Sequence, residues 1–217
     1  MKTIIALTGV KTSGKSTAFN FVKEAYPEVR EIQLAKRLKD ACSDVLGIER
    51  DAFDNPAKKE VALETPVYLD QAKVESLIRY FGFEPDYDKH VRAHVGTVLE
   101  TPRRAAQYVG TEILRAVDPD VHCKGSVLGL PEDGLFVVTD MRFLNEYDFF
   151  AKNYKFEFFP FYIQSDRAEF NATDMHPSER QVLEVAKLCK KLPNNGSMED
   201  LKAMVLEEIS SVMEPHG

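Results

Sequence analysis

The chain has 217 residues, 44% of them hydrophobic, which is enough apolar material for one proper core. Its net charge of −7 argues against broad binding to nucleic acids or acidic membranes, because such binding needs a basic face. Its three cysteines are odd in number and far apart, so we expect reduced thiols and a cytoplasmic protein. No apolar run reaches the roughly 18 residues of a membrane span, and the sequence opens on a core strand, so neither a span nor a signal peptide is expected.

The first elements form a strand, a glycine loop and a helix. Lys2–Thr8 is an apolar, β-branched run, and G-x-x-x-x-G-K-S then spans Gly9 to Ser16. A helix-compatible segment follows through Tyr26, and Pro27 ends it. This order is the context that a phosphate-binding P-loop requires. Its glycines permit backbone angles that let successive N–H groups point at phosphate oxygens, and the helix adds its positive N-terminal end.

The P-loop predicts a site for ATP. Lys15 would bridge the β- and γ-phosphates, and the Ser16 hydroxyl would take a position on Mg²⁺. The alternative is a glycine-rich turn with a solvated lysine, against which the flanking strand and helix argue. The predicted ATP-binding residues are Gly9, Val10, Lys11, Thr12, Ser13, Gly14, Lys15, Ser16 and Thr17.

The sequence pattern that predicts secondary structure becomes weaker between the P-loop helix and residue 100. A short strand is predicted at 29–34 and a helix at 35–46. The stretch 47–99 is rich in charge and proline, with helical patches near 70–81 and 88–99. We interpret it as a helical insertion within one domain over residues 1–217, because its apolar content is too patchy for a core of its own.

Residues 101–117 predict one helix, with Thr101 as N-cap and Pro102 at the first position. Two arginines lie in its first turn, against the positive end of the helix, and a broken local rule often marks a functional site. One helix face offers guanidinium, amide and hydroxyl groups, which suit a phosphate and the edge of a base. Solvated basic side chains are the alternative. The predicted acceptor-binding residues are Arg104, Gln107, Tyr108 and Thr111, with Lys36 from the helix at 35–46.

Residues 134–139 predict a fully buried strand, and Asp140 follows it directly. At this place P-loop proteins hold Mg²⁺ with a carboxylate, directly or through water. Arg142 nearby would neutralise charge on the transferring phosphoryl group. A turn cap for Asp140 and a surface ion pair for Arg142 are the alternatives. Asn145 predicts the N-cap of the next helix.

The remaining elements are strands at 155–163 and 187–192, a short helix at 178–185 and a closing helix at 197–213. Ser197 and Asp200 predict a capping box for the last helix. The polar loop 164–180 carries Arg167, which would close over the ATP phosphates as part of a lid; a plain surface loop is the alternative. Strands that alternate with helices predict an α/β fold with a three-layer parallel sheet.

Six motifs follow one another from Gly9 to Leu201 and make the sequence resemble the bacteriophage deoxynucleoside monophosphate kinases. They are G-V-K-T-S-G-K-S, L-A-K-R-L-K-D, T-P-R-R-A-A-Q-Y-V-G-T-E, V-T-D-M-R-F-L-N-E, D-M-H-P-S-E and N-N-G-S-M-E-D-L. The resemblance implies a P-loop kinase fold with a helical acceptor-binding insertion. It also implies Mg²⁺ and transfer of the γ-phosphoryl of ATP to a deoxynucleoside monophosphate (dNMP), a step that supplies DNA precursors.

By position, the resemblance implies that Lys15 and Ser16 bind ATP and Mg²⁺. It also implies that Arg104 and Gln107 face the acceptor nucleotide. The catalytic residues that we predict are Lys15, Asp140, Arg142 and Arg167, and the predicted metal ligands are Ser16 and Asp140. The chain departs from the family pattern in three places: it has Lys36-Arg37 in place of a small residue or Asp–Pro, Val121-His122 near an expected Trp, and a poorly matching segment 47–99.

Two alternatives to a dNMP kinase stay open. Another small-metabolite P-loop kinase, of the phosphomevalonate or dephospho-coenzyme-A type, would share the strand–loop–helix layout. A nucleotide switch or sensor is the other; a GTPase should show Asn-Lys-x-Asp, which the sequence lacks. The expected partners are ATP and a dNMP, with no nucleic acid and no membrane. The expected location is the host cytoplasm if a phage encodes the protein, and both a monomer and a homodimer are open.

Overall fold

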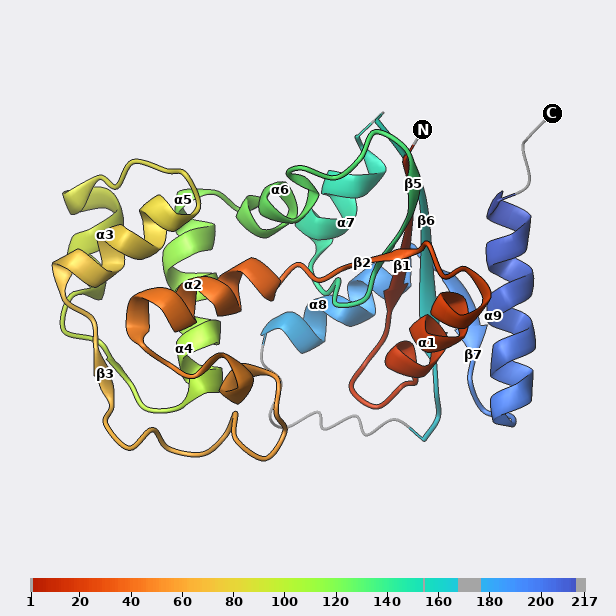
Figure 1. The fold of residues 1–217 in the computed structure, drawn as a ribbon, viewed down its shortest axis with the longest axis horizontal. Helices are drawn as coiled ribbons and strands as arrows, with labels where there is room; N and C mark the ends of the chain where they lie inside the picture. The colour runs from red at the N-terminus through yellow and green to blue at the C-terminus, as the bar shows by residue number, and fades with distance from the viewer. Residues whose placement is uncertain (1, 154, 168–176, 214–217) are drawn as a thin grey trace. The chain divides into compact units, whose positions relative to one another are not determined.

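The computed structural model describes residues 2–153, 155–167 and 177–213, with side chains omitted at 177–179. The chain divides into two compact units. The first combines Met1–Gln33 with Gly129–Gly217, and the second is the continuous stretch Leu34–Leu128. Figure 1 shows the second unit as the orange-to-green part of the ribbon.

Five parallel strands form the sheet of the first unit, in the order β2-β5-β1-β6-β7. The strand β1 is central: it pairs with β5 from Lys2↔Gly134 to Ala6↔Val138, and with β6 as far as Thr8↔Tyr162. The predicted strands are confirmed, although β2 is shorter than predicted and β7 begins three residues later. The strands are β1 (Lys2–Thr8), β2 (Arg30–Ile32), β5 (Gly134–Val138), β6 (Phe156–Gln164) and β7 (Lys190–Pro193).

Helices cover both faces of this sheet, which confirms the predicted three-layer α/β architecture (Figure 1). The helices α1 (Lys15–Ala25) and α9 (Met198–Met213) lie on one face, where Val22 and Val205 belong to one buried cluster with Ile5 of β1. The helices α7 (Leu144–Ala151) and α8 (Pro177–Ala186) lie on the other, where the rings of Phe150 and Phe158 stack with centroids 5.7 Å apart. Alternate residues of the strands therefore pack in opposite directions.

The parallel arrangement brings four loops to one edge of the sheet. The P-loop follows β1, Asp140 follows β5, Arg167 follows β6 and Asn194 follows β7. Parallel strands end at the same edge, where open α/β sheets bind their ligands. The topology thus brings together loops that are distant in sequence, with Ser13 and Asn194 181 positions apart.

Two predicted helix starts have different outcomes. The capping box of α9 is confirmed, because Asp200 N–H donates to Ser197 Oγ at 3.1 Å and Ser197 N–H donates to Asp200 Oδ2 at 2.8 Å. The prediction of Asn145 as an N-cap is wrong, since α7 already begins at Leu144. Glu146 satisfies the free N–H groups there by reaching back along the chain.

The second unit is mainly helical. Residues 71–80 confirm the first helical patch. The second is confirmed only over 87–94, which form a π-helical and a 3₁₀ turn, whereas 98–99 pair with 67–68 in a small antiparallel sheet. The helix at 121–127 was not predicted. The elements are α2 (Lys36–Leu46), η1 (Arg50–Phe53), β3 (Val67–Tyr68), α3 (Gln71–Tyr80), η2 (Tyr87–Val91), η3 (Arg92–His94), β4 (Val98–Leu99), α4 (Pro102–Tyr108), η4 (Val109–Leu114), α5 (Arg115–Val117) and α6 (Val121–Val127).

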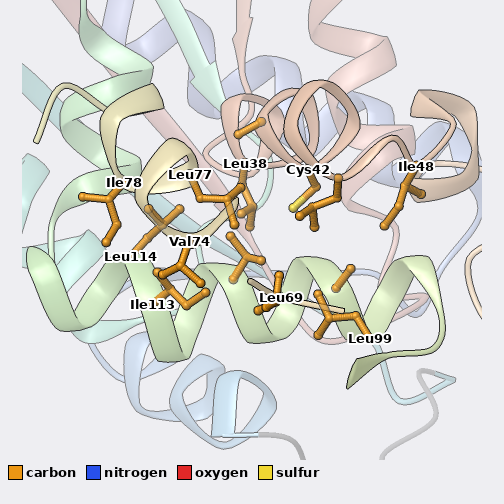
Figure 2. Packing of buried hydrophobic residues seen from close by; sticks show 14 of the residues in the cluster. Leu38, Cys42, Ile48, Leu69, Val74, Leu77, Ile78, Leu99, Ile113 and Leu114 are labelled. Atoms are coloured by element: carbon orange, nitrogen blue, oxygen red, sulfur yellow. The ribbon is translucent and has the colours of Figure 1, made fainter. Parts of the chain in front are cut away.

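A buried apolar cluster fills the second unit. Figure 2 shows Leu38 and Cys42 of α2 pointing toward side chains of α3 and of the π-helical turn η4, among them Leu77 and Ile113. The cluster draws on residues before and after 47–99 as well as inside it, so the compact unit is larger than the predicted insertion. In the described part of the chain, no helix has both the length and the apolar character needed to cross a membrane.

Candidate active site

The loop after β1 has a backbone that requires its two glycines. A Cβ at Gly9 would lie 2.5 Å from Ser13 Oγ and 2.8 Å from the carbonyl oxygen of Ile163, so a side chain does not fit there. Gly14 has φ +104°, a left-handed conformation that L side chains rarely adopt, and its Cβ would lie 2.5 Å from Asn194 Nδ2. Gly14 is also the N-cap of α1, so the loop leads directly into the positive end of that helix.

Lys15 begins α1, and its ammonium group folds back over the loop. Its Nζ donates to the carbonyl oxygens of Gly9 at 2.8 Å and of Val10 at 2.7 Å. These acceptors are neutral, whereas phosphate oxygens are charged and form stronger hydrogen bonds with an ammonium group. The ammonium group can therefore exchange these carbonyl acceptors for the oxygens of a phosphate that enters the loop.

Asn194, which follows β7, holds the P-loop from the side. Its Nδ2 donates to the carbonyl oxygen of Ser13 at 2.9 Å, and its backbone N–H donates to the carbonyl of Gln164 at 2.6 Å. One residue therefore ties together the loops that follow β1, β6 and β7. Asn194 lies within the N-N-G-S-M-E-D-L motif, but nothing in the sequence alone indicates this role.

The segment after β5 is fixed by two buried polar side chains. Thr8 Oγ1 donates to the carbonyl oxygen of Met141 at 2.8 Å. The carboxylate of Glu146, only 3% exposed, accepts from the backbone N–H groups of Arg142 at 2.7 Å and of Phe143 at 3.0 Å. The backbone that carries Asp140 and Arg142 is therefore anchored to β1 and to α7. Glu146 is a second residue to which the sequence analysis gave no role.

Ser16 and Asp140 were predicted to hold Mg²⁺, and their chemistry fits that ion. Ser16 is exposed in the first turn of α1, and Asp140 is half-buried directly after β5. Hydroxyl and carboxylate oxygens are hard donors, which Mg²⁺ prefers, and this ion is commonly held by one or two protein oxygens together with water and substrate phosphates. Their role as metal ligands stays a prediction.

Arg167 lies where the loop after β6 meets the loop before α9. Its Nη2 donates to the carbonyl oxygens of Asn195 at 2.8 Å and of Gly196 at 3.2 Å. Asp166 and Asn195 exchange two further hydrogen bonds beside it. The predicted lid spans 164–180, of which 168–176 lie outside the described residues. The catalytic role of Arg167 stays a prediction.

The predicted acceptor-binding residues belong to the second unit. Thr101 Oγ1 accepts from the backbone N–H of Arg104 at 3.1 Å, which confirms the predicted N-cap of α4. Arg104 is exposed, Gln107 and Thr111 are half-buried, and Lys36 is exposed at the first position of α2. Their contact with an acceptor stays a prediction.

Tyr108 is the most constrained member of this set. Its hydroxyl lies 3.0 Å from His94 Nδ1 and 3.1 Å from Thr97 Oγ1, and the guanidinium carbon of Arg104 lies 5.2 Å from the centre of its ring. Partial burial lowers the pKa of His94 below its ordinary value, against an opposing effect of Glu112. In the sequence, His94 stands out only through its i, i+4 spacing from His90, which zinc ligands can have but which lacks a third ligand, and no motif includes Thr97.

His122 is a buried polar residue near the place where the resemblance leads us to expect Trp. Its Nε2 lies 3.2 Å from the carbonyl oxygen of Gly110, and since a carbonyl can only accept, Nε2 carries the proton. Its Nδ1 is buried without a hydrogen-bond partner in the described structure. Burial, with a smaller effect of Arg115, lowers the pKa of His122 to about 4.

No family model matches the chain. A protein of Acanthamoeba polyphaga mimivirus named "Putative deoxynucleotide monophosphate kinase" is 26% identical over 218 aligned positions, which cover 94% of each chain. The solved structure of dephospho-CoA kinase from Campylobacter jejuni matches with a TM-score of 0.50 and 12% identity, over 100% of both chains. The structure of TT1252 from Thermus thermophilus matches with a TM-score of 0.42 and 15% identity, over 98% of both chains. With its five-stranded parallel sheet and glycine loop, the chain thus has a P-loop kinase-like α/β fold.

Proposed function

We propose that the protein is a dNMP kinase, which transfers the γ-phosphoryl group of ATP to a deoxynucleoside monophosphate and releases the diphosphate and ADP. The observation that carries the proposal is the P-loop. Two glycines whose positions exclude side chains, and a lysine folded over the loop at the N-terminus of α1, support phosphate binding there. The similarity to the mimivirus protein over nearly its whole length supports the choice of acceptor.

In this proposal the chain aligns two anionic substrates and neutralises the moving phosphoryl group, because phosphoryl transfer needs little covalent chemistry from a protein. The P-loop N–H groups and Lys15 bind the phosphates of ATP. Arg142 and Arg167 supply further positive charge. Mg²⁺, when bound with Ser16 and Asp140, adds charge neutralisation at the phosphates.

The acceptor side of the proposal depends on the second unit. Arg104 offers a planar guanidinium that can bind a phosphate through two hydrogen bonds, and Gln107 offers an amide that can read the edge of a base. In the described part of the chain, Arg104 forms no ion pair with a carboxylate, so its charge is available for an anion. The proposed partners are ATP and a dNMP, without nucleic acid or membrane.

A coupled ADP-release assay tests the proposal, with ATP, Mg²⁺ and separate acceptors: the four common dNMPs, the matching ribonucleotides, dephospho-CoA and phosphomevalonate. We expect ADP release that depends on one or more dNMPs. Turnover with only a non-nucleotide acceptor would leave the P-loop assignment in place and overturn the choice of acceptor. Slow ATP hydrolysis that no acceptor stimulates would favour a switch or sensor.

A further inference from the structure

The hydroxyl of Tyr108 has two hydrogen-bond partners inside the second unit. A tyrosine hydroxyl has one proton to donate and accepts through its oxygen lone pairs. His94 Nδ1 at 3.0 Å and Thr97 Oγ1 at 3.1 Å occupy two positions around it, and His94 also packs edge-on against the ring with centroids 5.7 Å apart. These partners hold the hydroxyl within the unit, while the ring of Tyr108 is the part that contacts Arg104.

Both partners of this hydroxyl lie in one turn, residues 94–97, which is hydrogen-bonded to Leu69. Thr97 N–H donates to the carbonyl of His94 at 3.2 Å, Gly96 N–H donates to the carbonyl of Leu69 at 2.7 Å, and Leu69 N–H donates to the carbonyl of Thr97 at 2.9 Å. Leu69 is 1% exposed and belongs to the apolar cluster of the unit. The turn is thus attached to the core, and it holds the Tyr108 ring in one place on α4.

The ring in turn supports Arg104. These two residues are four positions apart on α4, so they lie on the same helix face, and the guanidinium carbon is 5.2 Å from the ring centre. A long exposed arginine loses conformational freedom when it binds an anion, and a ring that already holds the guanidinium reduces that loss. The first turn of a helix is electrostatically unfavourable for a cation, which makes such support more useful there.

We propose that His94 and Thr97 are positioning residues that lock Tyr108 as a platform for Arg104, whose guanidinium binds the phosphate of the acceptor nucleotide. This inference rests on the proposed function, because it takes the acceptor to be a monophosphate. It gives a role in acceptor binding to His94 and Thr97, which lie outside the sequence motifs. It also changes the role of Tyr108 from a hydrogen-bonding group for the substrate to a support for its neighbour.

The test is a double-mutant cycle with Thr97→Val and Arg104→Ala, read as the KM for the acceptor and the KM for ATP. In the otherwise unchanged chain, Thr97→Val should raise the acceptor KM about threefold to tenfold, the range that one hydrogen bond is worth, and leave the ATP KM within about twofold. In the Arg104→Ala background, Thr97→Val should have no further effect, because Thr97 acts through Arg104. Thr97→Ser keeps the hydroxyl, so its acceptor KM should equal that of the unaltered chain.

Tyr108→Phe and His94→Ala should behave like Thr97→Val, and His94→Asn should recover part of the loss by placing a polar atom near the Nδ1 position. His90→Ala is the matched control, because His90 lies on the preceding turn and, among the described residues, accepts only from the backbone N–H of Asp86. Thermal unfolding of each variant separates a misfolded unit from a misplaced arginine.

An equal rise of both KM values, or an undiminished effect of Thr97→Val in the Arg104→Ala background, would overturn the inference. An acceptor KM that does not change in Thr97→Val, Tyr108→Phe and His94→Ala would overturn it as well. Failure of the proposed function is a separate result. If the unaltered protein uses a different phosphorylated acceptor, the dNMP assignment is wrong, and the same cycle with that acceptor still decides whether Thr97 acts through Arg104.

Discussion

The ammonium group of Lys15 is held by two carbonyl oxygens of its own loop, so ATP binding would exchange those acceptors for phosphate oxygens. Arg104 differs from Lys15 in its surroundings: it is exposed, and an aromatic ring supports it. The two cations are therefore expected to serve different substrates, and single substitutions should separate their effects.

Lys15→Ala should lower turnover by about 100-fold or more at any concentration of acceptor, because it removes a charge that stabilises the transferring phosphoryl group. Arg104→Ala should instead raise the KM for the acceptor and leave ATP binding close to normal. Steady-state kinetics with each substrate varied in turn, together with direct measurement of ATP binding, checks both results. An equal loss of ATP binding in the two variants would contradict this division of roles.

His122 makes the stability of the protein depend on pH. Its folded pKa of about 4 lies below its ordinary value of 6.5, so in this interval the unfolded chain binds more protons than the folded one. The free energy of unfolding therefore falls as the pH falls from 6.5 toward 4. For this one group the loss between pH 7 and pH 5 should be about 2 kcal/mol.

His122→Gln should reduce that pH dependence. A glutamine can keep an N–H group for the Gly110 carbonyl but does not titrate. Urea unfolding at pH 7, 6 and 5 gives the free energies, and the variant should show the smaller decline. His90→Gln is the comparison, since it removes a histidine that is only half-buried. Identical declines in the His122 variant and the unaltered chain would show that His122 is not the group that responds.

At the level of elements, the segment between β5 and α7 depends on one buried carboxylate. Glu146 accepts two backbone N–H groups, one of them from Arg142. Glu146→Gln should cost about 1–3 kcal/mol in unfolding free energy, because a neutral side chain replaces charge-assisted hydrogen bonds in a buried site. It should also lower kcat through misplacement of Arg142.

Urea unfolding and kcat at saturating substrates measure the two effects of Glu146→Gln. Glu207→Gln is the matched control, since Glu207 is an exposed glutamate on α9. A normal kcat in a destabilised Glu146→Gln protein would show that the catalytic step does not need this anchor.

The hydrogen bond from Asn194 to Ser13 connects the last strand to the first loop. Asn194→Ala should raise the KM for ATP about threefold to tenfold, because the loop loses a support that holds it ready for phosphates. The KM for the acceptor should not change. Titration of ATP binding at equilibrium measures the effect directly, and unaltered ATP affinity would remove Asn194 from the site.

Much of the first unit could be predicted from the sequence, because its signals are local. The run Lys2–Thr8, the glycines of the loop and the capping box at Ser197 each identify an element through nearby residues. The wrong prediction at Asn145 has a physical reason: the preceding residues already follow an extended path into α7, and Glu146 caps the helix from inside.

The second unit is harder to predict, because contacts between segments that are distant in sequence determine its structure. The sequence predicts a helical patch over 88–99, yet Gly96 with φ +89° and the hydrogen bond from its N–H to Leu69 end the helical part before it. The helix from 101 to 117 was found, but its π-helical turn at 109–114 was not, since the close approach of Gly110 to Leu38 is a tertiary effect. The contacts of Asn194, Glu146 and Thr97 have no local sequence signal for the same reason, and the spacing of His94 from His90 points to zinc instead of Tyr108.

For the whole molecule, ATP should act as a stabilising ligand. A ligand that binds only the folded state at 100 times its Kd adds about 2.7 kcal/mol, which for a chain of this size corresponds to a Tm increase of about 5–10 °C. Thermal unfolding with and without MgATP measures the increase in the unaltered chain. Lys15→Ala should show little or none of it. An equal increase in both proteins would place ATP binding away from the P-loop.

The bond between Asn194 and Ser13 joins residues 181 positions apart. It has a consequence for synthesis, because a chain that emerges from the ribosome exposes its glycine loop long before the residue that holds it. During that interval the nascent chain contains the glycine loop but not Asn194, whose hydrogen bond holds the loop. ATP binding should therefore mature late, after β7 has taken its place at the edge of the sheet.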